Sequence, residues 1–180
     1  ICASSIGAAY LQKSALMYDK LSVLYQDNNG NLWVGSDRGI SSFDPNYTGF
    51  MGVGPGSNLK KSLPSPNVWS FCEDFSLRYL FVGTDQGVSR LDREEGKFVH
   101  LDRWRNMEDN GSEHQYSVMS LYCISKDTLL VGFEDGLFKL IIEPDLSYNY
   151  ERLNYVERGM MSELDRVYSI KKDGKNSFFL

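Results

Sequence analysis

Residues that commonly do chemistry are few in this sequence, and their spacing does not favour catalysis. The 180 residues include two histidines, His100 and His114, and three cysteines. Neither histidine falls in the spacing of a nucleophile–histidine–carboxylate triad or beside paired carboxylates. There is no CxxC pair, and so few Cys and His residues do not predict a metal site. We therefore expect no metal and no cofactor, with Cys72 and Cys123 buried as free thiols.

A short stretch rich in Asp and Asn resembles the beginning of a calcium-binding loop. Asp27, Asn29 and Asn31 have the alternating spacing of such a loop. A calcium loop requires Gly at its sixth position and Glu at its twelfth, where this sequence has Leu32 and Arg38. Asn and Gly tolerate positive φ, so we interpret the stretch as a hairpin turn.

Aromatic and cationic residues gather in one polar segment, residues 102–116. Arg103, Trp104 and Arg105 are adjacent there, and His114 follows them. Sugars stack on aromatic faces and are oriented by a few converging polar groups, so these four residues are candidates for contacting a ligand. The alternative is that Trp104 packs over the edge of a neighbouring structural unit.

The composition is that of an ordered globular protein. Hydrophobic residues make up 42% and charged residues 24% of the chain, so global disorder is not expected. The net charge is −5 and no run of Lys or Arg occurs, which disfavours nucleic-acid binding. No apolar run approaches the roughly 18 residues of a membrane span. The uncharged residues 1–9 fit either the end of a secretory signal peptide or a first strand.

One pattern occurs three times and organises the whole chain. Its copies span residues 31–43, 80–91 and 129–140. Each copy has an apolar run ending in Val-Gly, a short mostly polar step, a second Gly and another apolar run. The first glycines of the copies, Gly35, Gly83 and Gly132, lie 48 and 49 residues apart. A repeat of this length indicates an array of supersecondary units.

Each copy is preceded by an alternating apolar and polar stretch, which is typical of a β-strand. No stretch has the 3.6-residue apolar period of a long helix. Four short antiparallel strands in about 48 residues are typical of a β-propeller blade, whereas a β-sandwich would not generate an in-register repeat. We therefore predict an all-β fold, a β-propeller fragment of four-stranded antiparallel blades with roughly three and a half blades present.

The predicted boundaries follow the repeat. A lead-in at residues 1–20 precedes three blades and a truncated fourth, at residues 21–53, 68–101, 117–153 and 166–180. The loops between them are predicted at residues 54–67, 102–116 and 154–165. By register Leu180 corresponds to Val34, so we expect the chain to be part of a longer protein. Trp33 and Trp69 fall on repeat strands and are expected in the core.

Ligands of propellers usually meet the loops at one end of the central channel. The short turns between second and third strands contain acidic residues, which we expect to cap their own turns. The other turn residues, Arg38, Gln86 and Glu134, are then candidates for ligand contact. The Val-Gly glycines are expected to allow close backbone approach between blades. His100 is expected at the surface of an outer strand.

These motifs resemble the two-component regulator propeller repeat. The first unit carries Asp27, Gly30, Leu32, Trp33, Val34, Gly35, Ser36, Gly39, Ile40, Phe43 and Asp44 at positions of the family pattern. The second unit keeps Val68, Ser70, Asp74, Val82, Gly83, Thr84, Gly87, Val88, Asp92, Gly96 and Phe98. Phe81 and Leu130 replace the family's tryptophan in the second and third units, and Phe133 replaces its threonine. The resemblance covers roughly residues 20–180.

The resemblance implies a periplasmic sensor domain, extracytoplasmic and without enzyme activity in this segment. In that family such domains often belong to hybrid two-component systems of Bacteroidetes, and many detect oligosaccharides. Further blades and a membrane-anchored histidine kinase would follow in the same chain, with a small molecule or oligosaccharide as ligand and a homodimer as one assembly. Two alternatives are a propeller enzyme of the streptogramin-lyase type and a structural or interaction propeller.

Overall fold

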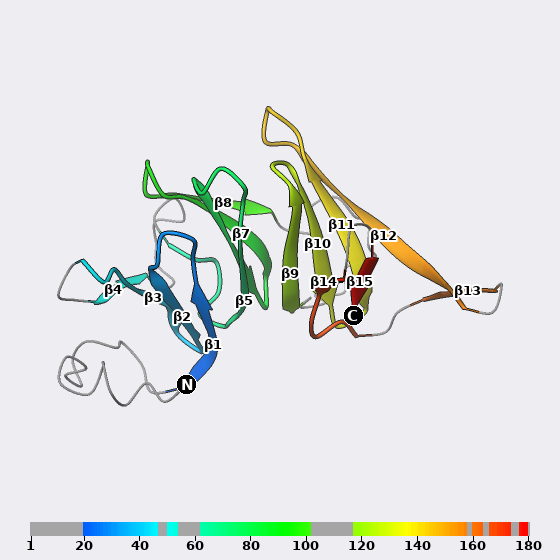
Figure 1. Ribbon diagram of the computed structural model, residues 1–180, viewed down its shortest axis with the longest axis horizontal. Coiled ribbons are helices and arrows are strands. Elements are labelled where there is room, and N and C mark those ends of the chain that lie inside the picture. The colour runs from blue at the N-terminus through cyan, green and yellow to red at the C-terminus, as the bar shows by residue number, and fades with distance from the viewer. Residues whose placement is uncertain are drawn as a thin grey trace.

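The computed structural model describes residues 20–46, 50–53, 62–101, 117–157, 160–163, 166–173 and 177–179. Within these residues all regular structure is β-strand, arranged as sheets that stand side by side in chain order (Figure 1). The absence of a helical period in the sequence is matched by the absence of a helix in these parts of the chain.

Three sheets are antiparallel meanders in which consecutive strands pair. The first contains β1 (Leu21–Gln26), β2 (Leu32–Ser36), β3 (Gly39–Phe43) and β4 (Phe50–Val53). The second contains β5 (Val68–Glu73), β6 (Tyr79–Thr84), β7 (Gly87–Asp92) and β8 (Lys97–Leu101). The third begins with β9 (Val118–Ser125), β10 (Thr128–Phe133), β11 (Gly136–Ile142) and β12 (Tyr148–Glu157). The second glycine of each repeat opens the third strand at positive φ: 130° at Gly39, 104° at Gly87 and 143° at Gly136.

The third sheet extends beyond its predicted boundary. Residues 154–165 were expected to be a loop, but β12 continues to Glu157 and pairs with a further strand, β13 (Met160–Glu163). The loop prediction followed from the repeat length alone. The local sequence around Leu153, Tyr155 and Val156 instead has the residue types that favour strands, and they extend β12.

A fourth unit begins after the third sheet. Its described strands are β14 (Lys171–Asp173) and β15 (Ser177–Phe179), which pair as a hairpin. Val167 and Ile170, just before β14, are buried against Leu130 and Leu137 of the third sheet. The fourth unit therefore packs on the third in the same way that the earlier units pack on one another.

Neighbouring sheets bury one apolar core between each pair. Trp33 and Ile40 of the first sheet share a core with residues of the second, among them Phe71 and Val82. The opposite face of the second sheet, including Phe81 and Val88, packs on the third sheet at Leu121, Leu129 and Val131. Each sheet is therefore covered face to face by its sequence neighbours, as in blades of a propeller. The prediction of a β-propeller fragment is confirmed.

The Val-Gly glycines lie where neighbouring sheets approach most closely. A Cβ added to Gly83 would lie 2.6 Å from Val118 Cγ1 and 2.9 Å from Val118 O. A Cβ on Gly35 would lie 2.7 Å from Val68 Cγ1, and one on Gly132 would lie 2.5 Å from the Val167 carbonyl oxygen. Only glycine leaves room for the next inner strand, which confirms the role expected from the sequence.

Serine hydrogen bonds tie each inner strand to the next. Ser70 Oγ donates to Val118 O at 3.0 Å, and Ser120 Oγ donates to Val167 O at 2.9 Å. In the first unit the equivalent position, opposite Gly35, is Val23. The preceding residue, Ser22, supplies the hydroxyl instead and donates to Val68 O.

Candidate functional site

A β-bulge lies at the start of each of the first three inner strands. Ser22, Trp69 and Met119 are the extra residues in β1, β5 and β9, each lacking a partner on the adjacent strand. Bulges redirect a side chain and occur frequently beside functional sites. Trp69 is 39% exposed although Val68 and Ser70 on either side of it are buried. The prediction that Trp69 is a core residue was wrong, because Trp69 is the extra residue of the bulge and its side chain is turned out of the core that buries the rest of β5.

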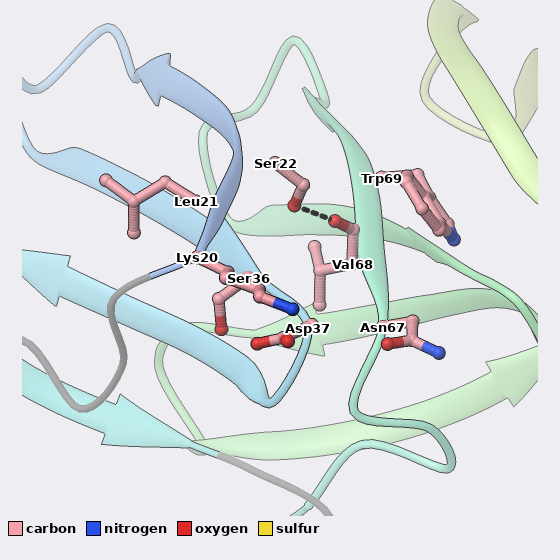
Figure 2. A pocket seen from close by; sticks show the side chains of 8 residues that line it. All are labelled: Lys20, Leu21, Ser22, Ser36, Asp37, Asn67, Val68 and Trp69. Carbon is pink, nitrogen blue, oxygen red and sulfur yellow. Dashed lines mark hydrogen bonds between the residues drawn. The ribbon is translucent and has the colours of Figure 1, made fainter.

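A pocket opens at this end of the inner strands, between the first and second sheets (Figure 2). Its volume is about 90 Å³. Its lining comes from three chain segments and consists of Lys20, Leu21, Ser22, Ser36, Asp37, Asn67, Val68 and Trp69. Sites for whole drug-sized ligands are roughly 300 Å³ or larger, so this pocket fits the edge of a ligand rather than a complete oligosaccharide.

The pocket combines an ammonium group, a carboxylate and an amide with an aromatic ring close by. Lys20 and Asp37 lie on one side of β5, while the ring of Trp69 lies on the other side (Figure 2). The Asn67 amide donates from Nδ2 to Asp85 Oδ2 at 2.6 Å, which fixes its orientation. Such a set of donors and acceptors can bind hydroxyl groups while the ring offers a stacking surface.

The turns at the rim of this end are capped by hydroxyl groups. Ser36 Oγ accepts from the Arg38 amide at 3.1 Å and donates to Gly39 O at 2.9 Å. Thr84 Oγ1 makes the same pair of bonds to the Gln86 amide and Gly87 O. The expectation that the acidic residues cap these turns was wrong for Asp37 and Asp85. A Ser or Thr directly before the turn already reaches the backbone two residues further on.

Three of the sequence-predicted site residues lie at this end without lining the pocket. Arg38 and Glu134 are exposed and Gln86 is half-buried, each in a turn between the second and third strands of its sheet. Arg38 is adjacent in sequence to the pocket residue Asp37. Their role in ligand contact stays a prediction.

The remaining four candidates, Arg103, Trp104, Arg105 and His114, lie outside the residues that the structure describes. Sequence reasoning did not name Lys20, Asp37, Asn67 or Trp69 as ligand contacts. For Trp69 a signal was present, because it occupies the variable position of the Val-x-Ser motif that opens an inner strand. The bulge that exposes it is a property of strand pairing, which the motif alone does not reveal.

At the opposite end of the first sheet, Asp27 closes a hairpin turn. Its Oδ1 accepts from the amides of Asn29 at 3.0 Å and Asn31 at 2.8 Å, and its Oδ2 accepts from Trp33 Nε1 at 2.8 Å. The interpretation of this stretch as a hairpin turn is confirmed.

The same carboxylate belongs to an ion cluster that joins the first and second sheets. Arg93 lies 2.5 Å from Glu73 Oε1 and 3.3 Å from Asp27 Oδ2, with its guanidinium 5.5 Å from the centre of the Trp33 ring. Asn28 donates from its backbone amide and from Nδ2 to Glu73 Oε2, at 3.0 and 2.8 Å. We call these five residues the inter-sheet clamp.

The electrostatics of the clamp indicate a structural role. The side chains of Asp27 and Glu73 are 0% and 2% exposed. Burial alone would raise the pKa of Asp27, but hydrogen bonds from Trp33 and Asn31 and the charge of Arg93 outweigh it and lower that pKa. Burial, followed by the Glu73 charge, raises the pKa of the nearby Tyr25 to about 12. Because its carboxylates are buried and paired, the inter-sheet clamp presents no accessible carboxylate to a ligand.

The histidine and the cysteines that the structure describes are buried or half-buried within the sheets. His100 was expected at the surface, but it is half-buried on β8 because its Nδ1 hydrogen-bonds Ser89 Oγ on β7 at 2.9 Å. Cys72 and Cys123 are free and buried, as predicted. Burial, followed by the charges of Asp74 and Asp127, raises the pKa of Cys123 to about 11. Among the described residues, no group of three or more His, Cys, Asp and Glu could hold a metal.

The chain matches one family model and resembles several solved structures. Residues 16–38 match the family model of the two component regulator propeller. The resemblance inferred from the repeat is thus confirmed at its first unit. No curated protein matches the chain. The described residues contain no helix that is long and apolar enough to cross a membrane.

Two of the solved structures that resemble the chain are extracellular domains from one bacterium. The extracellular domain of BT4673 from B. thetaiotaomicron, described as a hybrid two component system, has a TM-score of 0.65 and 16% identity, covering 91% of this chain and 20% of that one. That of BT3049 from the same organism has a TM-score of 0.65 and 20% identity, with coverages of 91% and 21%. YCF48 from Cyanidioschyzon merolae has a TM-score of 0.51 and 8% identity, with coverages of 73% and 40%.

The similarity to these solved structures supports the β-propeller fold. At such identities they establish only that the sheets are arranged as in these proteins. The chain spans about a fifth of the length of the two B. thetaiotaomicron domains. It is therefore a β-propeller segment with a two-component regulator propeller repeat at its start.

Proposed function

We propose that this segment is the ligand-binding part of an extracytoplasmic, periplasmic sensor, and that its ligand is a carbohydrate. The proposed site is the pocket at the end of the inner strands, together with the Trp69 ring. Binding there would be passed to a membrane-anchored histidine kinase in the same protein, with a homodimer as one means of coupling. The two-component propeller match and the extracellular domains of similar fold support this class of function.

One observation carries the proposal: a large aromatic ring is exposed at a small pocket whose lining includes several polar groups. Trp69 is the bulge residue of β5 and is 39% exposed, while Lys20, Asp37 and Asn67 supply polar groups within the pocket. Sugars present an apolar ring face and several hydroxyl groups, so an aromatic surface beside a few fixed polar groups suits them. We infer that the segment binds without turnover.

The test is a binding measurement with the native-length protein. The probes are malto-, cello-, xylo- and manno-oligosaccharides of one to six rings, studied by isothermal titration calorimetry. At least one series should bind, and Trp69→Ala should weaken its binding by about tenfold or more, because central aromatic residues often carry more than 1.4 kcal/mol of binding free energy.

The matched control is Phe75→Ala. Phe75 is also an exposed aromatic residue of the second sheet, 70% exposed, but it lies in the turn after β5, at the other end of that strand from Trp69. Its loss should leave affinity unchanged. Equal effects of both substitutions would contradict binding by this end of the propeller. Release of shortened sugars from the probes would contradict binding without turnover.

A further inference from the structure

The bulge position of the inner strand recurs from unit to unit. Ser22, Trp69 and Met119 occupy it in the first three units. By sequence the corresponding residue of the fourth unit is Tyr168, which follows Val167 just as Trp69 follows Val68 and lies just before β14. Tyr168 is 59% exposed and Met119 is half-buried, although Val118 and Val167 before them are buried. Three successive units therefore present a large side chain at one structural position.

Hydrogen bonds hold these positions next to one another. Ser70, which follows Trp69, bonds the carbonyl of Val118, which precedes Met119. Ser120, which follows Met119, bonds the carbonyl of Val167, which precedes Tyr168. Trp69 on β5, Met119 on β9 and Tyr168 just before β14 therefore lie on segments that are hydrogen-bonded to one another directly beside these residues. We call Trp69, Met119 and Tyr168 the bulge row.

The bulge row begins where the pocket ends. In Figure 2 the Trp69 ring lies across β5 from Asp37 and Lys20, so the ring and those two pocket groups face different sides of the strand. The pocket, at about 90 Å³, holds only part of a ligand. A ligand that contacts both Asp37 and the Trp69 ring must therefore cross the start of β5.

A polar residue precedes each bulge position at a constant spacing in the sequence. Two positions before each bulge residue the sequence has Lys20, Asn67, Ser117 and Arg166. In the fourth unit Arg166 Nη1 donates to the Tyr168 hydroxyl at 3.4 Å. Each unit thus has a polar residue two positions before its bulge position, which is a suitable pattern for a chain of sugar rings that carry hydroxyl groups at their edges.

We propose that the bulge row is an extended binding surface that contacts a linear oligosaccharide in successive units, and that Tyr168 is a specificity-determining residue for chain length. This inference rests on the proposed function and deepens it. A monosaccharide would place one edge in the pocket and reach no further than Trp69. An oligosaccharide would continue along the row past Trp69 and Met119 to Tyr168.

The experiment compares chain lengths within the sugar series that the native-length protein binds. Affinity should rise stepwise from one ring to four or more. Tyr168→Ala should weaken binding of the longest probes by about fivefold to tenfold and leave the shortest binding probe unchanged. Trp69→Ala should weaken the binding of every probe long enough to contact the Trp69 ring, whatever its total length. Tyr168→Phe should keep most of the affinity if ring stacking is the main contribution.

The outcomes separate this inference from the proposed function. If no sugar binds, the proposed function fails and the inference fails with it. If a sugar binds and Trp69→Ala weakens it, but affinity is independent of chain length and of Tyr168, the proposed function stands and the extended surface is refuted. Phe75→Ala serves again as control, and the melting temperature of each variant reports whether it is folded.

Discussion

Single glycines set the distance between neighbouring sheets. Gly83 faces Ser70 of its own sheet and Val118 of the next, and any side chain there would meet backbone as well as side-chain atoms. Side-chain tips can rotate away, but the Val118 carbonyl is held by its hydrogen bond from Ser70. The repeat therefore depends on this position for close packing and not for an unusual φ.

We predict that Gly83→Ala destabilises the protein by about 1–3 kcal/mol, because overpacking a close contact shifts the surrounding backbone. Urea unfolding followed by circular dichroism measures the change. Gly96→Asn is the matched control, since Gly96 has a φ of 62° and open space around it, and Asn tolerates that conformation. An unchanged midpoint for Gly83→Ala would show that the sheets are less closely packed than described.

Turns and strand ends fasten one sheet to the next. The inter-sheet clamp joins the β1–β2 turn to the end of β5 and to Arg93, in the turn after β7. Its two carboxylates are buried, so removing one partner leaves another without full compensation. The clamp and the Ser22 hydrogen bond to Val68 O hold opposite ends of the same two inner strands.

Asp27→Asn should lower the free energy of unfolding by about 1–3 kcal/mol at pH 7, through weaker bonds to Trp33 and Arg93. The folded pKa of Asp27 lies below its ordinary value of 3.8. Its contribution is therefore complete above that pH and is lost as the pH falls through the folded value. The difference between wild type and variant should shrink in acid. Denaturation at pH 7 and pH 3 measures this, and a difference that grows in acid would contradict the assignment.

The repeat allowed most strands to be located from sequence, because Val-Gly pairs and turn residues mark them locally. The glycine contacts were predictable for the same reason. The exposure of Trp69 was not predictable, because a bulge depends on how two strands pair and no pattern within one strand indicates it. The clamp was also missed. Arg93 lies 66 residues from Asp27, and only the stacking of two sheets brings them together.

The outer face of the first sheet differs from its counterparts. Leu24 pairs with Val34 as Phe71 pairs with Val82 and Leu121 with Val131. Phe71 and Leu121 are buried against the preceding sheet, whereas Leu24 is 62% exposed. Leu21 is exposed as well, although Val68 at the same position is buried. This face has the composition of a surface between sheets.

We therefore expect the isolated 180-residue chain to self-associate through the face that contains Leu21 and Leu24, since large exposed apolar patches promote association. Leu24→Glu should reduce the associated fraction in sedimentation velocity experiments, because it places a charge in the apolar contact. Phe75→Glu, at an exposed turn, should not. A wild-type chain that sediments as a single monomer and melts cooperatively would refute this expectation.

The most direct measurement is a crystal structure of the native-length protein with the oligosaccharide that binds it most tightly. We expect sugar rings at the end of the inner strands, with one edge in the pocket at Asp37 and Asn67 and a ring stacked on Trp69 across β5. An ordered sugar on another surface, with this end unchanged, would contradict the assignment of the ligand site.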